Sequence, residues 1–340
     1  MLPQLLQNLT DTWRDPLNAA GIQLASPLAA IQLGGATGKD RKINYLVFTA
    51  ERETPHLMMK IARTATYQER LSHEHEALTN IWQNPSLQEG VPRPLGIFTV
   101  DNNLVLLEQC LLGTSLKVLL RRRQRITPIQ ARQDCEQSIN WLQKMQQATA
   151  IGTVLFEGET AVIQRQQHLN MSLPPAFNHH LCTLAEKYKG IDIPLCGSHG
   201  DYWPGNLLWH NGAIGVIDWE DFQSGVWPFH DFFLYFINYA DIYPWQGWRW
   251  SPMATAFSYA LLEQNWFADI FANCTQQYFQ ALDIPYEAAS LFLSLFLMDQ
   301  ATPPAAAGQK RQQQAAVWQK RLAHYAKHIS QSIFNRSIPS

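Results

Sequence analysis

The sequence predicts an α+β fold in which a β-rich N-terminal part precedes a mainly helical part. Between residues 22 and 108, short apolar runs alternate with turn signals, which is typical of antiparallel strands. After residue 108, longer segments carry apolar residues at helical spacing, interrupted by one hairpin signal. We therefore expect a five-stranded antiparallel sheet with one helix, followed by a helical region with one embedded hairpin.

The composition is that of a globular protein and excludes several other classes. The 340 residues are 46% hydrophobic and 16% charged, which argues against disorder. A formal net charge of -2 gives no electrostatic signature of nucleic-acid or anionic-membrane binding. The five cysteines have no CxxC spacing, which favours a reducing compartment over disulfides or zinc. Without a signal-peptide pattern or an apolar run of about 20 residues, we expect a soluble, cytoplasmic protein.

The N-terminal elements follow in a regular order. Residues 4–20 are predicted to be helical, within an N-terminal extension covering 1–21. A helix with Leu71, Leu78 and Ile81 at helical spacing is expected between the third and fourth strands. The last two strands meet at Asp101-Asn102-Asn103, whose residue types tolerate positive φ in a hairpin turn. The predicted strands are residues 29–33, 43–48, 57–61, 95–100 and 104–107.

The rest of the chain is expected to be mostly helical, with one exception between residues 195 and 218. There, two short apolar pieces flank Asn211-Gly212, and Asn-Gly between such runs is a strong hairpin signal. The run at residues 288–298 is too short to span a bilayer and is expected to be a buried helix. The predicted helical segments are residues 115–190, 230–240, 252–282, 286–300 and 309–332.

Three polar residues around this hairpin suit phosphoryl transfer. Asp201 lies in the loop before the hairpin, Asn206 lies where that loop ends, and Asp218 lies on the return strand. The hairpin should bring its two ends together. Phosphoryl transfer requires a carboxylate to accept the acceptor's proton, oxygen ligands for Mg²⁺ and cations around the phosphates. Two protein oxygens suit Mg²⁺, because this ion seldom occupies an all-protein cage.

The string His199-Gly200-Asp201, Asn206 and Ile217-Asp218-Trp219 resembles the motifs of the aminoglycoside phosphotransferase and choline kinase superfamily. The resemblance covers roughly residues 25–300 and implies a two-lobed protein-kinase-like fold using ATP and Mg²⁺. It implies that Asp201 is the catalytic base, that His199 shapes the loop by bonding to backbone, and that Asn206 and Asp218 hold magnesium. It also implies that Asp231 braces the catalytic loop.

In the N-terminal part, the same resemblance assigns a nucleotide site. Lys60 stands where the family has its phosphate-binding lysine, although a solvent-exposed strand lysine is the alternative. Its carboxylate partner should be Glu74, which matches the family's Glu-x-x-x-Leu pattern, with Glu76 still possible. Residues 104–113 resemble the segment that places adenine against backbone amides. The loop with Gly34, Gly35 and Gly38 could lie over the phosphates or be an ordinary hairpin loop.

Together these observations predict a helical extension (1–21), a nucleotide-binding N-lobe (22–108) and a catalytic, acceptor-binding C-lobe (109–340). The expected enzyme transfers the γ-phosphoryl group of ATP to a hydroxyl of a small molecule, sugar-like or an amino alcohol. No nucleic-acid, membrane or protein partner follows from the sequence. Trp245, Trp248 and Trp250 are candidates for the acceptor pocket, or for the core.

Two alternatives to this function remain at the level of the sequence. One is a catalytically inactive kinase fold that binds nucleotide or acts as a scaffold. The presence of Asp201 argues against it, because a binding module has no need of a catalytic base. The other is a protein kinase, which is disfavoured because the chain has no Asp-Phe-Gly or Ala-Pro-Glu segment.

Overall fold

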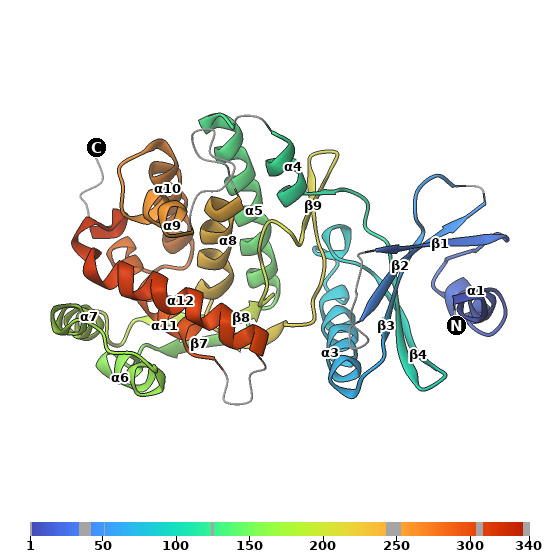
Figure 1. The fold of residues 1–340 in the computed structure, drawn as a ribbon, viewed down its shortest axis with the longest axis horizontal. Coiled ribbons are helices and arrows are strands. Elements are labelled where there is room, and N and C mark those ends of the chain that lie inside the picture. Colours follow the sequence, from blue (N-terminus) through green and yellow to red (C-terminus); the bar gives the residue numbers. More distant parts are fainter. Residues whose placement is uncertain are drawn as a thin grey trace. The chain divides into compact units, whose positions relative to one another are not determined.

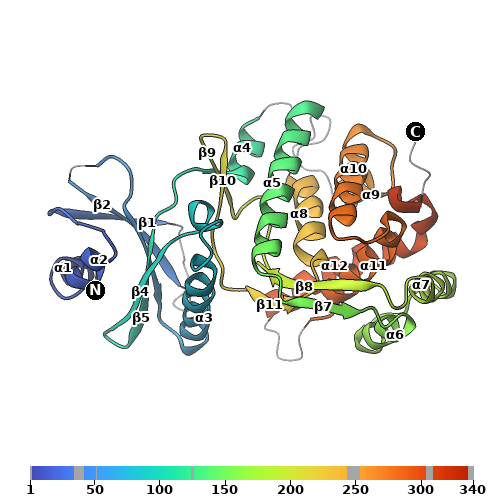
Figure 2. The ribbon, with the colours of Figure 1, turned by 180° about the vertical axis from the view of Figure 1, so that it is seen from behind.

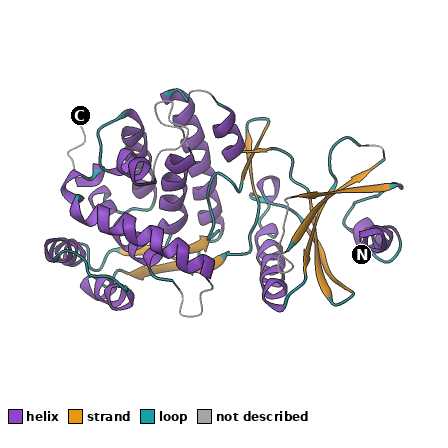
Figure 3. Ribbon diagram, viewed as in Figure 1, coloured by secondary structure: helices purple, strands orange, loops and turns teal. Residues whose placement is uncertain are grey.

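The computed structural model describes residues 2–33, 42–50, 52–123, 126–242, 253–303 and 309–335. It confirms the α+β class, because the five-stranded sheet lies in the N-terminal part while helices dominate the C-terminal part (Figure 3). The chain divides into two compact units. The first unit comprises Met1–Leu116, His199–Asp201 and Gly205–Phe222. The second unit comprises Lys117–Ser198, Tyr202–Pro204 and Gln223–Ser340.

The first unit is built on a five-stranded antiparallel sheet with the strand order β1-β2-β3-β5-β4 (Figure 1). All five predicted strands are confirmed. In the turn between the last two strands, Asp101 and Asn102 have φ values of 49° and 62°. Positive φ at both turn residues matches the twist of the flanking strands. The strands are β1 (Leu28–Leu33), β2 (Ile43–Thr49), β3 (Leu57–Ala62), β4 (Pro94–Val100) and β5 (Asn103–Gln109).

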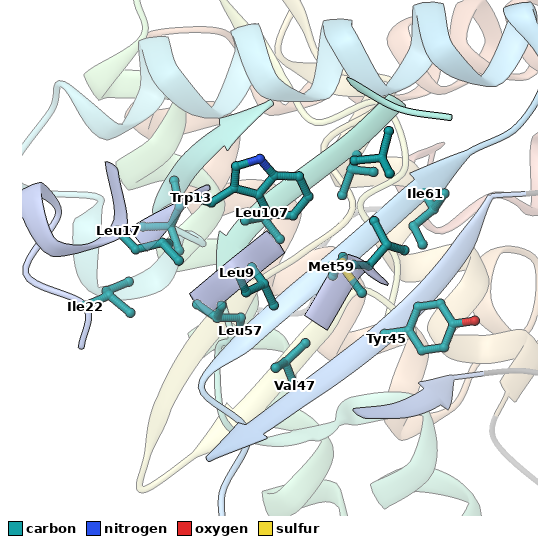
Figure 4. Packing of buried hydrophobic residues seen from close by; sticks show 14 residues of the cluster. Leu9, Trp13, Leu17, Ile22, Tyr45, Val47, Leu57, Met59, Ile61 and Leu107 are labelled. Atoms are coloured by element: carbon teal, nitrogen blue, oxygen red, sulfur yellow. The ribbon is translucent and has the colours of Figure 1, made fainter. Parts of the chain in front are cut away.

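Helices cover both faces of this sheet. The predicted helix α3 (Ala65–Trp82) lies on one face, and α1 (Leu2–Thr10) with α2 (Arg14–Ala19) lies on the other (Figure 2). The single helix expected at 4–20 is thus two helices, with a turn that carries Trp13 onto Phe98 at 4.5 Å between ring centroids. Figure 4 shows the resulting core, in which Trp13 lies among apolar side chains of the sheet.

The predicted hairpin is also present in the first unit. It consists of β9 (Leu207–His210) and β10 (Ala213–Val216), and β9 also pairs with β6 (Thr114–Ser115). The Asn211-Gly212 turn has φ values of 48° and 79°, as the Asn-Gly signal requires. Beyond the strands, the Ile217 N–H donates to the Asn206 carbonyl at 3.0 Å. The hairpin therefore does bring its two ends together.

The second unit is mainly helical, as predicted, but it also contains a small sheet. Strands β7 (Gly152–Leu155), β8 (Asp192–Ser198) and β11 (Gln223–Val226) pair in the order β11-β8-β7 (Figure 2). The prediction that residues 115–190 are mostly helical did not include strand β7. Every residue of β7 is exposed, so the segment has no buried face to reveal a strand, and its pairing with β8 defines it.

The long helices of the second unit bury many aromatic side chains. The predicted run at 288–298 is a buried helix, α11. Within the described residues, no single helix is long and apolar enough to cross a bilayer. Two successive helical segments, Trp266–Ala281 and Tyr286–Ala301, pass such a test only as a pair bent by 113°. The helices are α4 (Leu116–Arg122), α5 (Pro128–Ala148), α6 (Glu159–His168), α7 (Pro175–Lys187), α8 (Phe229–Ile242), α9 (Met253–Leu261), α10 (Trp266–Ala281), α11 (Ala289–Ala301) and α12 (Gln309–Lys327).

Candidate active site

The His-Gly-Asp loop follows β8 and is held by its own first two residues. His199 is fully buried; its Nε2 lies 3.1 Å from the Ile217 carbonyl, and its Nδ1 lies 3.3 Å from the Asp201 N–H. The ring therefore donates through Nε2 and accepts at Nδ1. Gly200 has φ of 80°, and a Cβ there would lie 2.2 Å from the Asp221 carbonyl oxygen. Only glycine permits this close approach of two backbone segments.

This loop places Asp201 beside Asn206. The Asn206 amide nitrogen donates to Asp201 Oδ2 at 2.9 Å and to the Asp201 carbonyl at 3.0 Å. Burial raises the pKa of the Asp201 carboxyl and Asp218 adds to this effect, whereas His199 and the Asn206 hydrogen bond oppose it. The amide oxygen of Asn206, which a metal would require, takes no part in these bonds.

Asp218 occupies a specialised backbone position just after the hairpin. Its φ of 70° lies in the left-handed region, which is uncommon for residues other than glycine and clusters at functional sites. The next residue, Trp219, is fully buried and holds this turn. Its backbone N–H donates to Glu74 Oε1 at 3.1 Å, and its indole N–H donates to the Val216 carbonyl at 2.9 Å.

The lysine of β3 is buried rather than exposed. Lys60 Nζ donates to Glu74 Oε1 at 2.6 Å and pairs with Glu108 at 2.8 Å. Glu74 is fully buried whereas Glu76 is exposed, so Glu74 is the partner of Lys60. Burial alone would lower the pKa of Lys60, but Glu108, Glu74 and Asp218 outweigh it and keep the ammonium charged. Burial raises the pKa of Glu108 to about 7, against the influence of Lys60.

Sequence reasoning missed Lys42, which precedes β2 and points into the same group of carboxylates. Its Nζ lies 2.7 Å from Asp218 Oδ1, 2.9 Å from Glu220 Oε2 and 3.6 Å from Glu74 Oε2. Burial would raise the pKa of Asp218, but the nearby Lys42 and Lys60 lower it to about 2. Nothing in the sequence near Lys42 pointed to this contact.

Arg70 of α3 is a second cation that the sequence did not reveal. It donates to both oxygens of Asp221, at 2.9 and 3.0 Å, and approaches Glu220 Oε1 at 3.2 Å. The only signal was that two acidic residues, Glu220 and Asp221, directly follow Asp218-Trp219. Arg70 thus ties the segment after Asp218 to the helix that also carries Glu74.

The carboxylates of this cluster fit a divalent cation. Glu74, Asp218 and Glu220 each offer an oxygen, and these atoms lie within 4.8 Å of one another. Glu74 Oε2 is buried, and no described residue forms a hydrogen bond with it. A cationic group, the Lys42 ammonium, already lies among these oxygens. Oxygen donors of this kind are the ligands that Mg²⁺ prefers.

Six of the predicted residues are not described by the structure. Gly34, Gly35 and Gly38 lie outside the described residues. So do the three tryptophans at 245, 248 and 250. Asp231 of α8 belongs to the second unit, where it is fully buried and accepts a hydrogen bond from the Ser198 hydroxyl at 3.0 Å. Because Ser198 directly precedes His199 in the chain, this contact suits the expected bracing of the loop.

With this geometry established, the family follows from a sequence comparison. The model of the phosphotransferase enzyme family matches residues 38–292, which is most of the chain and includes Lys60, the His199-Gly200-Asp201 loop and Asp218. The chain belongs to this family. The kinase-like fold expected from the resemblance is therefore the fold of this phosphotransferase, with its five-stranded antiparallel sheet and its helical C-terminal part.

Solved structures similar to this phosphotransferase share little sequence with it. An amicoumacin kinase, solved with AMP-PNP, Ca²⁺ and Ami, is 15% identical, with 92% of this chain and 93% of that chain covered and a TM-score of 0.46. A mutant aminoglycoside 2'-phosphotransferase-IIIa in complex with GDP is 12% identical, with 92% and 95% covered and a TM-score of 0.49. An aminoglycoside phosphotransferase from Streptomyces rimosus is 13% identical, with 93% and 99% covered and a TM-score of 0.43. A search of curated proteins found no match.

Proposed function

We propose that this phosphotransferase transfers the γ-phosphoryl group of ATP, with Mg²⁺, to a hydroxyl of a small molecule. The observation that carries the proposal is the chain of contacts from Lys60 through Glu74 to the Trp219 N–H. It joins the lysine of the sheet to the turn that presents Asp218. A nucleotide-binding cation and a metal-binding carboxylate are thereby held together before any ligand arrives, as positioning catalysis requires.

In the proposed reaction, Asp201 orients the acceptor hydroxyl and takes its proton. The acceptor oxygen forms a bond to the γ-phosphorus while the bond from that phosphorus to the bridging oxygen of ADP breaks. The ordered His199 ring and the Asn206 amide fix the Asp201 carboxylate for this role. Because its pKa is raised, the Asp201 carboxylate accepts a proton more readily than a fully solvated aspartate does.

The remaining polar residues would bind the phosphates and the metal. Lys60 of β3 would supply positive charge to the phosphates, and its ion pair with Glu74 orients its ammonium group. Asp218 and Asn206 would hold Mg²⁺, with Glu220 as a further nearby oxygen donor. When bound, the ion neutralises the charge of the phosphate oxygens, which stabilises the transition state.

For the acceptor, we favour a neutral or singly charged molecule, sugar-like or an amino alcohol, over a polycationic aminoglycoside. A polycation needs a strongly anionic pocket. Of the acidic residues that lie near the tryptophans 245, 248 and 250 in the sequence, Asp241 already forms an ion pair with Arg321. Glu263 and Asp269 are dispersed along the chain. Aromatic side chains can bind either a sugar ring or an ammonium group.

The deciding experiment is a coupled ADP-release screen over sugars, amino sugars, nucleosides, amino alcohols and aminoglycosides, followed by Asp201→Asn. We expect turnover of the identified acceptor to fall by about 10²–10⁴-fold, because general-base catalysis contributes factors of this size. Nucleotide affinity should change little, since the amide keeps the size of the side chain and one oxygen that can accept from Asn206.

Asp192→Asn is the matched control, because Asp192 is an exposed aspartate of β8 outside this network, and its turnover should equal that of the wild type. Near-wild-type turnover of Asp201→Asn would exclude Asp201 as the base. Nucleotide binding with no turnover of any acceptor in the panel would favour the inactive, nucleotide-binding alternative.

A further inference from the structure

Lys42 lies among the carboxylate oxygens that could hold a metal ion. Its ammonium is within 3 Å of carboxylate oxygens of both Asp218 and Glu220, and Glu74 Oε2 is the next nearest oxygen at 3.6 Å. The Lys42 side chain is only 13% exposed, so these contacts are not those of a solvated surface lysine. All four residues belong to the first unit.

The backbone holds Lys42 in place. The next residue, Ile43, is the first of β2 and pairs with Ile61 of β3, while Asn44 pairs with Lys60. The sheet therefore anchors Lys42 beside the buried lysine and leaves only its flexible side chain to move. An ammonium on a four-carbon stem is a compact charge that can exchange one partner for another.

We propose that Lys42 is a tethered cation that closes the carboxylate site of the ligand-free protein to free divalent metal. Mg²⁺ binds oxygen at about 2.0–2.1 Å. An ion that ligates both Asp218 and Glu220 would then occupy the space of the Lys42 ammonium. The two cations also repel each other strongly at such separations. Lys42 and a divalent ion cannot occupy the site together.

The charges of the surrounding network give the direction of the effect. Among the described residues its cations are fewer than its carboxylates. Removal of one cation therefore increases the excess of negative charge and raises the affinity for a divalent ion. The network of ion pairs joins Lys42, Lys60 and Arg70 to Glu74, Glu108, Asp218, Glu220 and Asp221.

A metal–nucleotide complex would open the site where metal alone does not. Its phosphates provide the displaced ammonium with a new anionic partner close to Lys60. Metal and nucleotide should therefore bind cooperatively, and linkage requires the effect to be equal in both directions. Only this nucleotide step rests on the proposed function; the exclusion of metal alone follows from the contacts of Lys42 with the carboxylates.

The test is Mn²⁺ binding to the full chain without nucleotide, measured from the electron paramagnetic resonance signal of the free ion. Mn²⁺ takes the same oxygen ligands as Mg²⁺. Lys42→Met keeps the length of the side chain but removes its charge, and we expect it to bind Mn²⁺ at least 10-fold more tightly than the wild type. Adding Asp218→Asn to Lys42→Met should abolish this gain.

Two controls separate the local effect from a change in net charge. Lys189→Met removes one charge from an exposed lysine in the second unit and should leave Mn²⁺ affinity unchanged. Lys42→Arg keeps the cation and should behave as the wild type. Equal Mn²⁺ affinity in Lys42→Met and wild type would overturn the proposal, as would a gain that persists in the double variant.

A second measurement covers the case in which Lys42→Met folds poorly. Without the Lys42 ammonium, the neighbouring carboxylates repel one another, so the variant should melt at a lower temperature. Addition of Mn²⁺ should restore its melting temperature. The increase in melting temperature with Mn²⁺ should be larger for Lys42→Met and Lys42→Gln than for wild type. An equal increase in all three proteins would contradict the proposal. Because neither measurement involves turnover, failure here is distinguishable from the absence of kinase activity.

Discussion

Glu108 is a carboxylate in an environment that disfavours its charged form. It lies buried in β5, where its Oε1 contacts Lys60 and its Oε2 has no hydrogen-bond partner in the part of the chain that the structure describes. Lys60 shares its charge between Glu108 and Glu74, and Lys42 lies beyond Glu74. Two buried carboxylates thus compete for one ammonium, and burial makes the ionised form of Glu108 costly.

The pH dependence of stability should therefore differ between the wild type and Glu108→Gln. The pKa of Glu108 is raised to about 7 in the folded protein. For a carboxyl with a raised pKa, the stability it contributes is present at low pH and is lost as the pH rises through about 7. Glutamine has no such loss. Between pH 5 and pH 8.5, the variant should gain about 1–3 kcal/mol relative to the wild type.

Urea unfolding of both proteins at several pH values measures this difference. The difference in unfolding free energy between the two proteins also includes the loss of the ion pair with Lys60, which still pairs with Glu74. This contribution is present at every pH. Titratable groups common to both proteins cancel if they do not interact with Glu108. A difference in unfolding free energy that is constant from pH 5 to 8.5 would show that Glu108 titrates normally.

At the scale of elements, the two N-terminal helices are an integral part of the first unit. α1 and α2 cover the face of the sheet opposite α3, and their apolar residues belong to one core with the strands. The strand carrying Lys60 is thus supported from both sides. A lysine buried between two carboxylates needs this rigidity, because its ion pairs depend on exact placement of donor and acceptor.

Trp13→Ala should therefore destabilise the protein although Trp13 is far from the motifs in sequence. The indole is 4% exposed and stacks on Phe98. Removing a large buried aromatic costs about 3–5 kcal/mol, and denaturant unfolding should reveal a loss of this size. Ile129→Ala is the control, because Ile129 is 69% exposed and should change stability by less than about 0.5 kcal/mol. Equal losses would mean that α1 and α2 do not contribute to the core.

At the scale of the whole molecule, the proposed ligand should stabilise the fold through residues drawn from distant parts of the chain. We expect a non-hydrolysable ATP analogue to raise the melting temperature only when Mg²⁺ is present, because Asp218 repels an anionic triphosphate unless a metal lies between them. At a ligand concentration of 100 times Kd, the stabilisation should be about 2.7 kcal/mol.

Asp218→Ala tests the metal dependence. The variant should lose the additional stabilisation that Mg²⁺ provides, and calorimetry should show weaker binding of the Mg²⁺–nucleotide complex. Asp283→Ala, which changes an aspartate that also has positive φ but follows α10 in the second unit, controls for backbone effects. An unchanged Mg²⁺ effect in Asp218→Ala would remove Asp218 from the set of metal ligands.

The sequence alone determined the features that depend on neighbouring residues. The five strands, their hairpin turns and helix α3 follow from apolar periodicity and from residue types that accept positive φ. Such signals depend on a few neighbouring residues, so they can be recognised without knowledge of the fold. The motif around Asp201 and Asp218 could be recognised for the same reason, since its residues all lie close to one hairpin in the sequence.

Only the tertiary structure decided which charges meet. Lys42 contacts Asp218 across 176 positions, and Arg70 contacts Asp221 across 151. The choice between Glu74 and Glu76 depended on which side of α3 packs against the sheet, since both are glutamates two residues apart. Strand β7 exists because β8 lies beside it, and the break between α1 and α2 brings Trp13 onto Phe98. Contacts of this kind are set by the packing of the whole unit, and no local pattern of residues encodes them.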